Sequence, residues 1–197
     1  MNRREFLLRS PKITPKNQAE TFLAAGLEPY SGEWTHKQAS HLLRRTMFGA
    51  TKQNIDTVLG LSMSQAVDML LAPTAAPSEP KAYVNSGGVT QGNPWTSASY
   101  DGNLEGQRLA FLQSWWIELM SQHTISLREK MVLFWHNHFA CGANTVKDAR
   151  YMYKQNALLR TNAFGNFETL ARLITLDPAM LRYLSGSFNT KASPNEN

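Results

Sequence analysis

The residues best suited to chemistry lie in one short stretch, Phe134-Trp135-His136-Asn137-His138-Phe139. On a helix that turns 100° per residue, one side gathers Leu127, Met131, Phe134, Trp135 and His138. We therefore predict that His138 points inward and that His136 lies at the border of the apolar stripe. Asn137 should point away from the stripe, and it is a candidate binding residue. Because an imidazole can ligate a metal or transfer a proton, His136 and His138 are candidate catalytic residues. The alternative is a hydrogen-bonded core residue for His138 and a surface residue for His136.

A metal site at this helix end would need a further ligand. Two histidines two positions apart diverge by about 200° on a regular helix, so they cannot share one ion unless the helix distorts. The segment Asn195-Glu196-Asn197 offers two amides and a carboxylate, which suit an oxygen-liganded metal. We therefore consider a divalent metal bound by His138 and Glu196, with Asn195 as a binding residue and Glu196 in catalysis. The alternative is that 195–197 is only a polar loop.

Other polar residues are candidates for binding. Arg44 and Arg45 could pair with a carboxylate or an anion, or they could form a solvated helix face. Arg150 and Asn156 fall on the side of a helix that the pattern predicts to be buried, and buried polar groups must be paired. They therefore predict a buried polar network. Asp177-Pro178 is typical of a helix N-cap followed by proline in the first turn.

The elements that would position these residues are all helical. The expected helices start at a capping residue or a capping box and end near a glycine or proline. The expected capping boxes are Thr35 with Gln38, Ser62 with Gln65 and Ser126 with Glu129. The helices span 35–49, 51–60, 62–73, 103–120, 126–139, 145–163, 166–174 and 177–184. No segment alternates apolar and polar residues with period two, as a half-buried strand would. The sequence therefore predicts an all-α fold, an irregular multi-helix bundle in which 146–163 is central.

The chain divides by composition into an arm and a domain. Residues 1–33 contain several prolines and read as a flexible basic arm, and 34–197 form the helical domain. Residues 73–103 form a long irregular loop, and Trp95 and Tyr100 suggest that part of it packs against the domain. Such a loop could be a lid, an insertion or a surface excursion. No helix follows 193–197, so we expect the domain to be incomplete at its C-terminus.

Charge and composition exclude several partners. Five basic and one acidic side chain fall in the first sixteen residues, which leaves a nearly neutral body although the net charge is +5. This is not the clustered positive face of a nucleic-acid-binding protein. No apolar run approaches the roughly 20 residues of a transmembrane helix. Arg3-Arg4 is similar to a twin-arginine export signal, but no apolar stretch follows it. We therefore predict a cytoplasmic location, with export to the periplasm or envelope as the alternative.

Several motifs, in order along the chain, resemble those of one protein family. They are His41-Leu42-Leu43-Arg44-Arg45, Phe48-Gly49, Arg128-Glu129-Lys130-Met131, 134–139, Asp148-Ala149-Arg150, Gln155-Asn156, Gly165-Asn166-Phe167, 177–184, Asn189, Lys191 and 194–197. From about Glu28 onward the chain resembles the bacterial domain-of-unknown-function family 1800. The resemblance implies the N-terminal portion of a longer, mainly helical protein. It also implies a protein partner in the cell envelope, because such proteins are often encoded beside an exported family. Many relatives carry an aspartate where this chain has Ser185.

Two functions remain open from the sequence. The first is a polar, metal-dependent site of hydrolase type, formed by the His136–His138 helix end and Asn195-Glu196 and covered by the 73–103 loop. The second is a non-catalytic helical module for protein interaction or structure, whose buried polar residues only fix the packing.

Overall fold

The structure is a computed structural model that describes residues 30–194. The chain divides into two units, Met1–Glu33 and Trp34–Asn197, and the helices described below all belong to the second. Most of the predicted arm therefore lies outside the described residues, as do Asn195 and Glu196.

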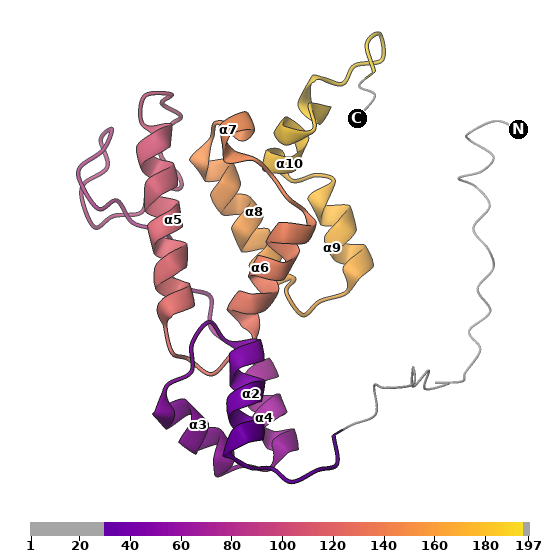
Figure 1. The fold of residues 1–197 in the computed structure, drawn as a ribbon. Coiled ribbons are helices and arrows are strands. Elements are labelled where there is room, and N and C mark those ends of the chain that lie inside the picture. The colour runs from indigo at the N-terminus through magenta and orange to yellow at the C-terminus, as the bar shows by residue number, and fades with distance from the viewer. Residues whose placement is uncertain (1–29, 195–197) are drawn as a thin grey trace, which may run out of the picture. The chain divides into compact units, whose positions relative to one another are not determined.

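The described part of the chain is helical, and the predicted all-α class is confirmed (Figure 1). Its elements are α2 (His36–Thr46), α3 (Lys52–Leu59), α4 (Met63–Leu71), α5 (Glu105–Ser121), α6 (Arg128–His138), α7 (Ala143–Val146), α8 (Ala149–Thr161), α9 (Phe167–Ile174), α10 (Pro178–Tyr183) and the 3₁₀ turn η1 (Gly186–Phe188). Within residues 30–194 the only extended pairing is two isolated bridges, Lys81 with Pro94 and Ser86 with Val89. No helix in this range combines the length and apolar character needed to cross a bilayer.

Helices α2, α3 and α4 pack around their own small core. Its buried members are Ala39, Leu43, Met47, Val58, Ala66 and Leu70. The predicted capping box at Ser62 and Gln65 forms in full at the start of α4. The one predicted at Thr35 and Gln38 is wrong, because the Thr35 hydroxyl bonds the Gln38 side chain and accepts no backbone N–H. This group is tied to α6 by Leu127, whose N–H donates to the Leu70 carbonyl (2.9 Å).

The larger core lies between α5 and α8, with α6 against the same central helix (Figure 1). The prediction of one continuous helix over 146–163 is wrong. Lys147 adopts a left-handed backbone (φ 53°) that ends α7, and Asp148 caps α8 by accepting from the Arg150 N–H. The break is stabilised from α5, because buried Glu105 accepts the Ala149 N–H at 2.7 Å. Without that carboxylate, the first amide of α8 would be buried and unpaired.

The segment between α4 and α5 is irregular, as predicted, and it packs against α5. Trp95 is 1% exposed, whereas Tyr100 is 51% exposed, so only the first of the two expected anchors is buried. Trp115 of α5 donates its indole N–H to the Ser78 carbonyl (2.9 Å), and Arg108 donates to the Ser99 carbonyl (2.8 Å). These bonds hold the loop as a fixed wall along α5.

Candidate functional site

His138 does not occupy the position that the helix pattern predicted. It is exposed at the end of α6, whereas Val132 is the fully buried residue of that helix. The prediction was wrong because α6 carries apolar side chains on nearly every side, from Met131 to Trp135. The periodicity therefore does not fix which side faces inward, and the contact with α8 decides it. Asn137 is exposed, as predicted.

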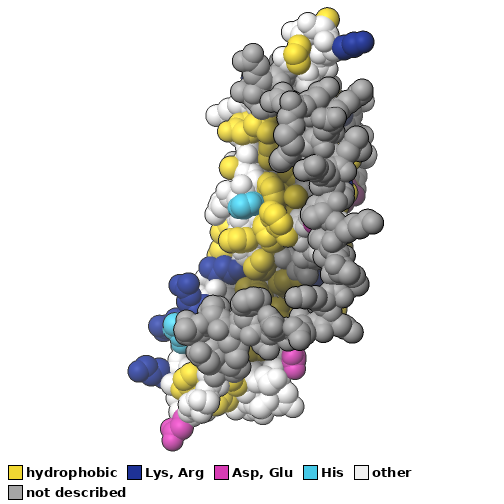
Figure 2. Space-filling model, turned by 90° about the vertical axis from the view of Figure 1, so that its right-hand side faces the viewer, with side chains coloured by type: hydrophobic (Ala, Val, Ile, Leu, Met, Phe, Trp, Pro, Cys, Tyr) yellow, Lys and Arg dark blue, Asp and Glu magenta, His cyan; other side chains and the backbone are white. Residues whose placement is uncertain are grey.

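The His138 ring belongs to an aromatic cluster that we define as Phe134, Trp135, His138, Phe139 and Phe167. The His138 centroid lies 4.7 Å from that of Phe139, 5.8 Å from that of Trp135 and 6.0 Å from that of Phe167. Phe134 and Phe167 are each 53% exposed. Figure 2 shows hydrophobic side chains gathered on this side of the molecule, with a histidine among them.

His136 is the more enclosed of the two histidines, which reverses the predicted order. Its ring stands edge-on to Trp116 of α5, with 5.1 Å between the centroids. Burial lowers the pKa of His136 below the ordinary 6.5, because the charged imidazolium would lose its hydration there. The neutral form is therefore the one that packs between α5 and α6.

The predicted metal site is only partly described. Among residues 30–194 no three His, Cys, Asp or Glu side chains come close enough together to hold a metal ion. Asn195 and Glu196 lie outside this range, so the pairing of His138 with Glu196 stays a prediction. The described metal-binding donors at this helix end are two imidazoles on different sides of α6. His136 contacts Trp116 of α5, whereas His138 contacts Phe167 of α9.

A buried ionic network links α6 and α8. Arg160 donates from both terminal nitrogens to the Glu129 carboxylate, and its Nη2 also donates to Asn156 Oδ1 (3.2 Å). Glu129 Oε2 accepts the Trp116 indole N–H as well (3.2 Å). The Arg160 side chain is 8% exposed and that of Glu129 22%. The predicted buried network therefore forms around Asn156, but Arg150 is not part of it. Glu129, expected to complete a capping box with Ser126, binds Arg160 instead.

The remaining predicted binding residues have mainly structural partners. The Arg150 guanidinium donates to both oxygens of the Asp148 carboxylate, from Nε (3.0 Å) and from Nη2 (2.8 Å), and its Nη1 donates to the Ala98 carbonyl (2.9 Å). This partner lowers the pKa of Asp148 although burial opposes it. Asp177 is the predicted N-cap, accepting the Met180 N–H at 2.8 Å, and burial raises its pKa. Arg44 and Arg45 are exposed on α2, in agreement with a solvated helix face.

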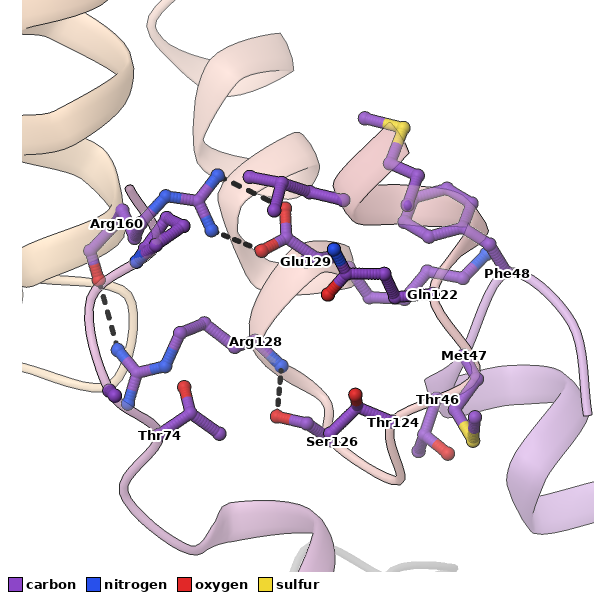
Figure 3. A pocket seen from close by; sticks show the side chains of 15 residues that line it. Thr46, Met47, Phe48, Thr74, Gln122, Thr124, Ser126, Arg128, Glu129 and Arg160 are labelled. Carbon is purple, nitrogen blue, oxygen red and sulfur yellow. Dashed lines mark hydrogen bonds and ion pairs between the residues drawn. The ribbon is translucent and has the colours of Figure 1, made fainter. Parts of the chain in front are cut away.

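The network forms one wall of a cavity of about 260 Å³ between α5, the start of α6 and the ends of α2 and α4 (Figure 3). In the close-up, Arg128 and Arg160 lie on one side, and Met47 and Phe48 lie on the other. The polar lining includes Thr46, Thr74, Gln122, Thr124, Ser126, Arg128, Glu129, Lys130 and Arg160. We call it the basic cavity, because three cations and one carboxylate line it.

Two of the three cations have no acidic partner within residues 30–194. Arg160 is neutralised by Glu129. Arg128 donates from Nη1 only to the Arg160 carbonyl (3.1 Å) and lies 5.1 Å from the Phe164 ring centroid. The Lys130 ammonium lies 4.2 Å from the Phe48 ring centroid, with no carboxylate in reach among these residues. The basic cavity therefore carries two uncompensated positive charges.

The start of α6 adds to this positive potential. Arg128 and Lys130 occupy its first turn together with Glu129, and the first amide of the helix, that of Arg128, donates to the Ser126 hydroxyl (3.2 Å). The N–H groups of Glu129 and Lys130 have no acceptor in the part of the chain that the structure describes. Amides of a first turn carry the positive end of the helix dipole and favour anions. The arrangement can hold an anion by charge-assisted hydrogen bonds.

Sequence reasoning missed this cavity. Arg128-Glu129-Lys130 was noticed only as part of a motif and of a capping box, and Arg160 was not singled out. The available signal was two basic residues in the first turn of a helix, where cations are unfavourable without a partner. Two of the cavity's other walls, 46–48 and 74–77, come from segments more than 50 residues before Arg128 in the chain, which spacing cannot bring together.

The fold and site together define an all-helical domain with a buried ionic network beside a basic cavity. Residues 41–197 match the family model described as "Protein of unknown function (DUF1800)". Since the match covers far more than half of the chain, the chain belongs to this family, as the resemblance implied. Comparison with curated proteins and with solved structures gives no match.

Proposed function

We propose that the domain binds a small anion of the phosphate type in the basic cavity. The observation that carries the proposal is the pair Arg128 and Lys130, two cations in one cavity without a carboxylate partner in the described chain. Desolvated charge of one sign is unfavourable unless a counter-charge neutralises it. A bound anion would supply that charge.

The surrounding groups favour phosphate. A phosphate group has several acceptor oxygens and suits a planar guanidinium, an ammonium and helix-terminal amides together. The hydroxyls of Thr74 and Thr124 line the same cavity and make no other hydrogen bond within residues 30–194. They can donate to the oxygens that the charged groups leave free.

Titration calorimetry of the 197-residue chain with inorganic phosphate tests the proposal. The key variant is Lys130→Gln, because the Lys130 side chain contacts the Phe48 ring but makes no hydrogen bond on which the fold depends. Loss of one charge-assisted contact should weaken phosphate binding about tenfold. Binding should also weaken as salt is added, since ionic contacts are screened.

Lys154→Gln is the matched control. Lys154 also lies over an aromatic ring, that of Tyr151 at 6.0 Å, but it is exposed on α8 and does not line the cavity. The control removes the same charge and the same kind of ring contact, and it should leave the affinity unchanged. No phosphate binding by the unaltered chain, or equal losses in Lys130→Gln and Lys154→Gln, would refute the proposal.

A further inference from the structure

The basic cavity is larger than inorganic phosphate requires. Its volume is about 260 Å³, whereas one water takes up roughly 30 Å³ of the liquid. Inorganic phosphate has only five heavy atoms, so it would leave most of this volume unfilled. A ligand that uses the cavity well must therefore carry a second group beside its charged one.

Apart from the cations, the hydroxyls, Gln122 and the paired Glu129, the lining is apolar. The apolar part consists of Met47, Phe48, Ala75, Pro77, Leu119 and Met120. Met47 is 5% exposed, so its side chain is a fixed part of this wall, whereas Phe48 is 39% exposed and offers its ring. Methionine adapts its shape to what it packs against, which suits Met120 to a varied partner.

The apolar wall meets the charged one at Phe48 and Lys130. The Lys130 ammonium lies 4.2 Å from the Phe48 ring centroid, so a positive charge and an aromatic surface border the same space. Binding sites for small molecules commonly combine an apolar lining with a few polar groups that set the orientation. The cavity has this composition, with the cations as the orienting groups.

We infer that the ligand is a phosphate monoester with an apolar organic group. The Lys130 ammonium, 4.2 Å from the Phe48 ring centroid, holds the phosphate, and the organic group packs against Phe48, Leu119 and Met120. The inference rests on the proposed function, because it needs the phosphate to bind at the same cavity. It adds that the apolar wall selects among phosphate compounds.

Phenyl phosphate and methyl phosphate, titrated separately into the full chain by calorimetry, test the inference. The two carry the same charged group, so only the organic part differs. Phenyl phosphate should bind about tenfold more tightly, from the apolar surface that it removes from water. Met120→Gln should reduce this preference and leave the affinity for methyl phosphate as it was. Met69→Gln, at a half-buried methionine outside the cavity, is the matched control and should keep the preference.

The outcomes separate the two proposals. Equal affinities for the two esters, or a Met120→Gln variant that keeps the full preference, would overturn the inference while phosphate binding stands. Equal losses of preference in Met120→Gln and Met69→Gln would overturn it too. If neither ester nor inorganic phosphate binds, both the inference and the proposed function fail.

Discussion

The ion pair between Glu129 and Arg160 is the feature whose removal the structure predicts most sharply. In Glu129→Gln the charge is lost while the shape is kept. The Arg160 guanidinium, with 8% of its side chain exposed, would retain Asn156 Oδ1 at 3.2 Å and the Trp115 ring at 5.5 Å. Neither partner carries a negative charge, so a buried cation would be left uncompensated.

The expected loss in the free energy of unfolding is about 2–3 kcal/mol. Removing one partner of a buried pair typically costs about 3–5 kcal/mol. Here the Glu129 side chain is 22% exposed at the cavity wall, where water screens the charge, and glutamine can still accept one N–H. The expected loss in the free energy of unfolding is therefore smaller than the cost of about 3–5 kcal/mol that is typical of a fully buried pair. For a domain of this size the melting temperature should drop by about 5–10 °C.

Urea unfolding followed by tryptophan fluorescence measures this loss. The matched control is Glu168→Gln, which removes the same charge from the pair with Arg172, whose side chains are 72% and 78% exposed. That pair should contribute less than about 0.5 kcal/mol. In Glu129→Gln/Arg160→Met no buried charge remains, so part of the loss should be recovered. Equal stability of the Glu129 and Glu168 variants would show that the network does not support the fold.

Three further predictions concern the sites named from the sequence. The folded pKa of His136 is below 6.5, so below that pH the unfolded chain binds more protons and the free energy of unfolding should fall as pH drops through 6.5. His136→Gln should remove this pH dependence, whereas His123→Gln, at an exposed side chain, should keep it. Asp177→Ala should lower stability by about 1 kcal/mol through loss of the cap, whereas Asp177→Asn, which can still accept the first-turn N–H, should be nearly neutral in the same urea assay. The hypothesis of a metal held by His138 and Glu196 predicts stoichiometric metal in elemental analysis of the purified chain, lost in His138→Ala with an unchanged circular dichroism spectrum; a metal-free chain would reject it.

Local signals in the sequence determined the fold class and most helix positions. Ser62 with Gln65 and Asp177 with Pro178 form the predicted caps, because a capping interaction involves residues at most three apart and needs no distant partner. The apolar pattern of the helix predicted that Asn156 is buried, and the rule that buried polar groups are paired predicted a hydrogen-bond partner for its side chain.

Only the tertiary structure decided which residues the site contains. On α6, apolar side chains on nearly all sides left the inward face undetermined, and packing against α8 buried Val132 and exposed His138. Arg160 pairs with Glu129 because α8 packs beside α6, and Glu129 therefore does not form the capping box expected with Ser126. The physical reason is the same in both cases: period and capping are fixed within a few residues, whereas burial and charge pairing depend on segments that folding brings together.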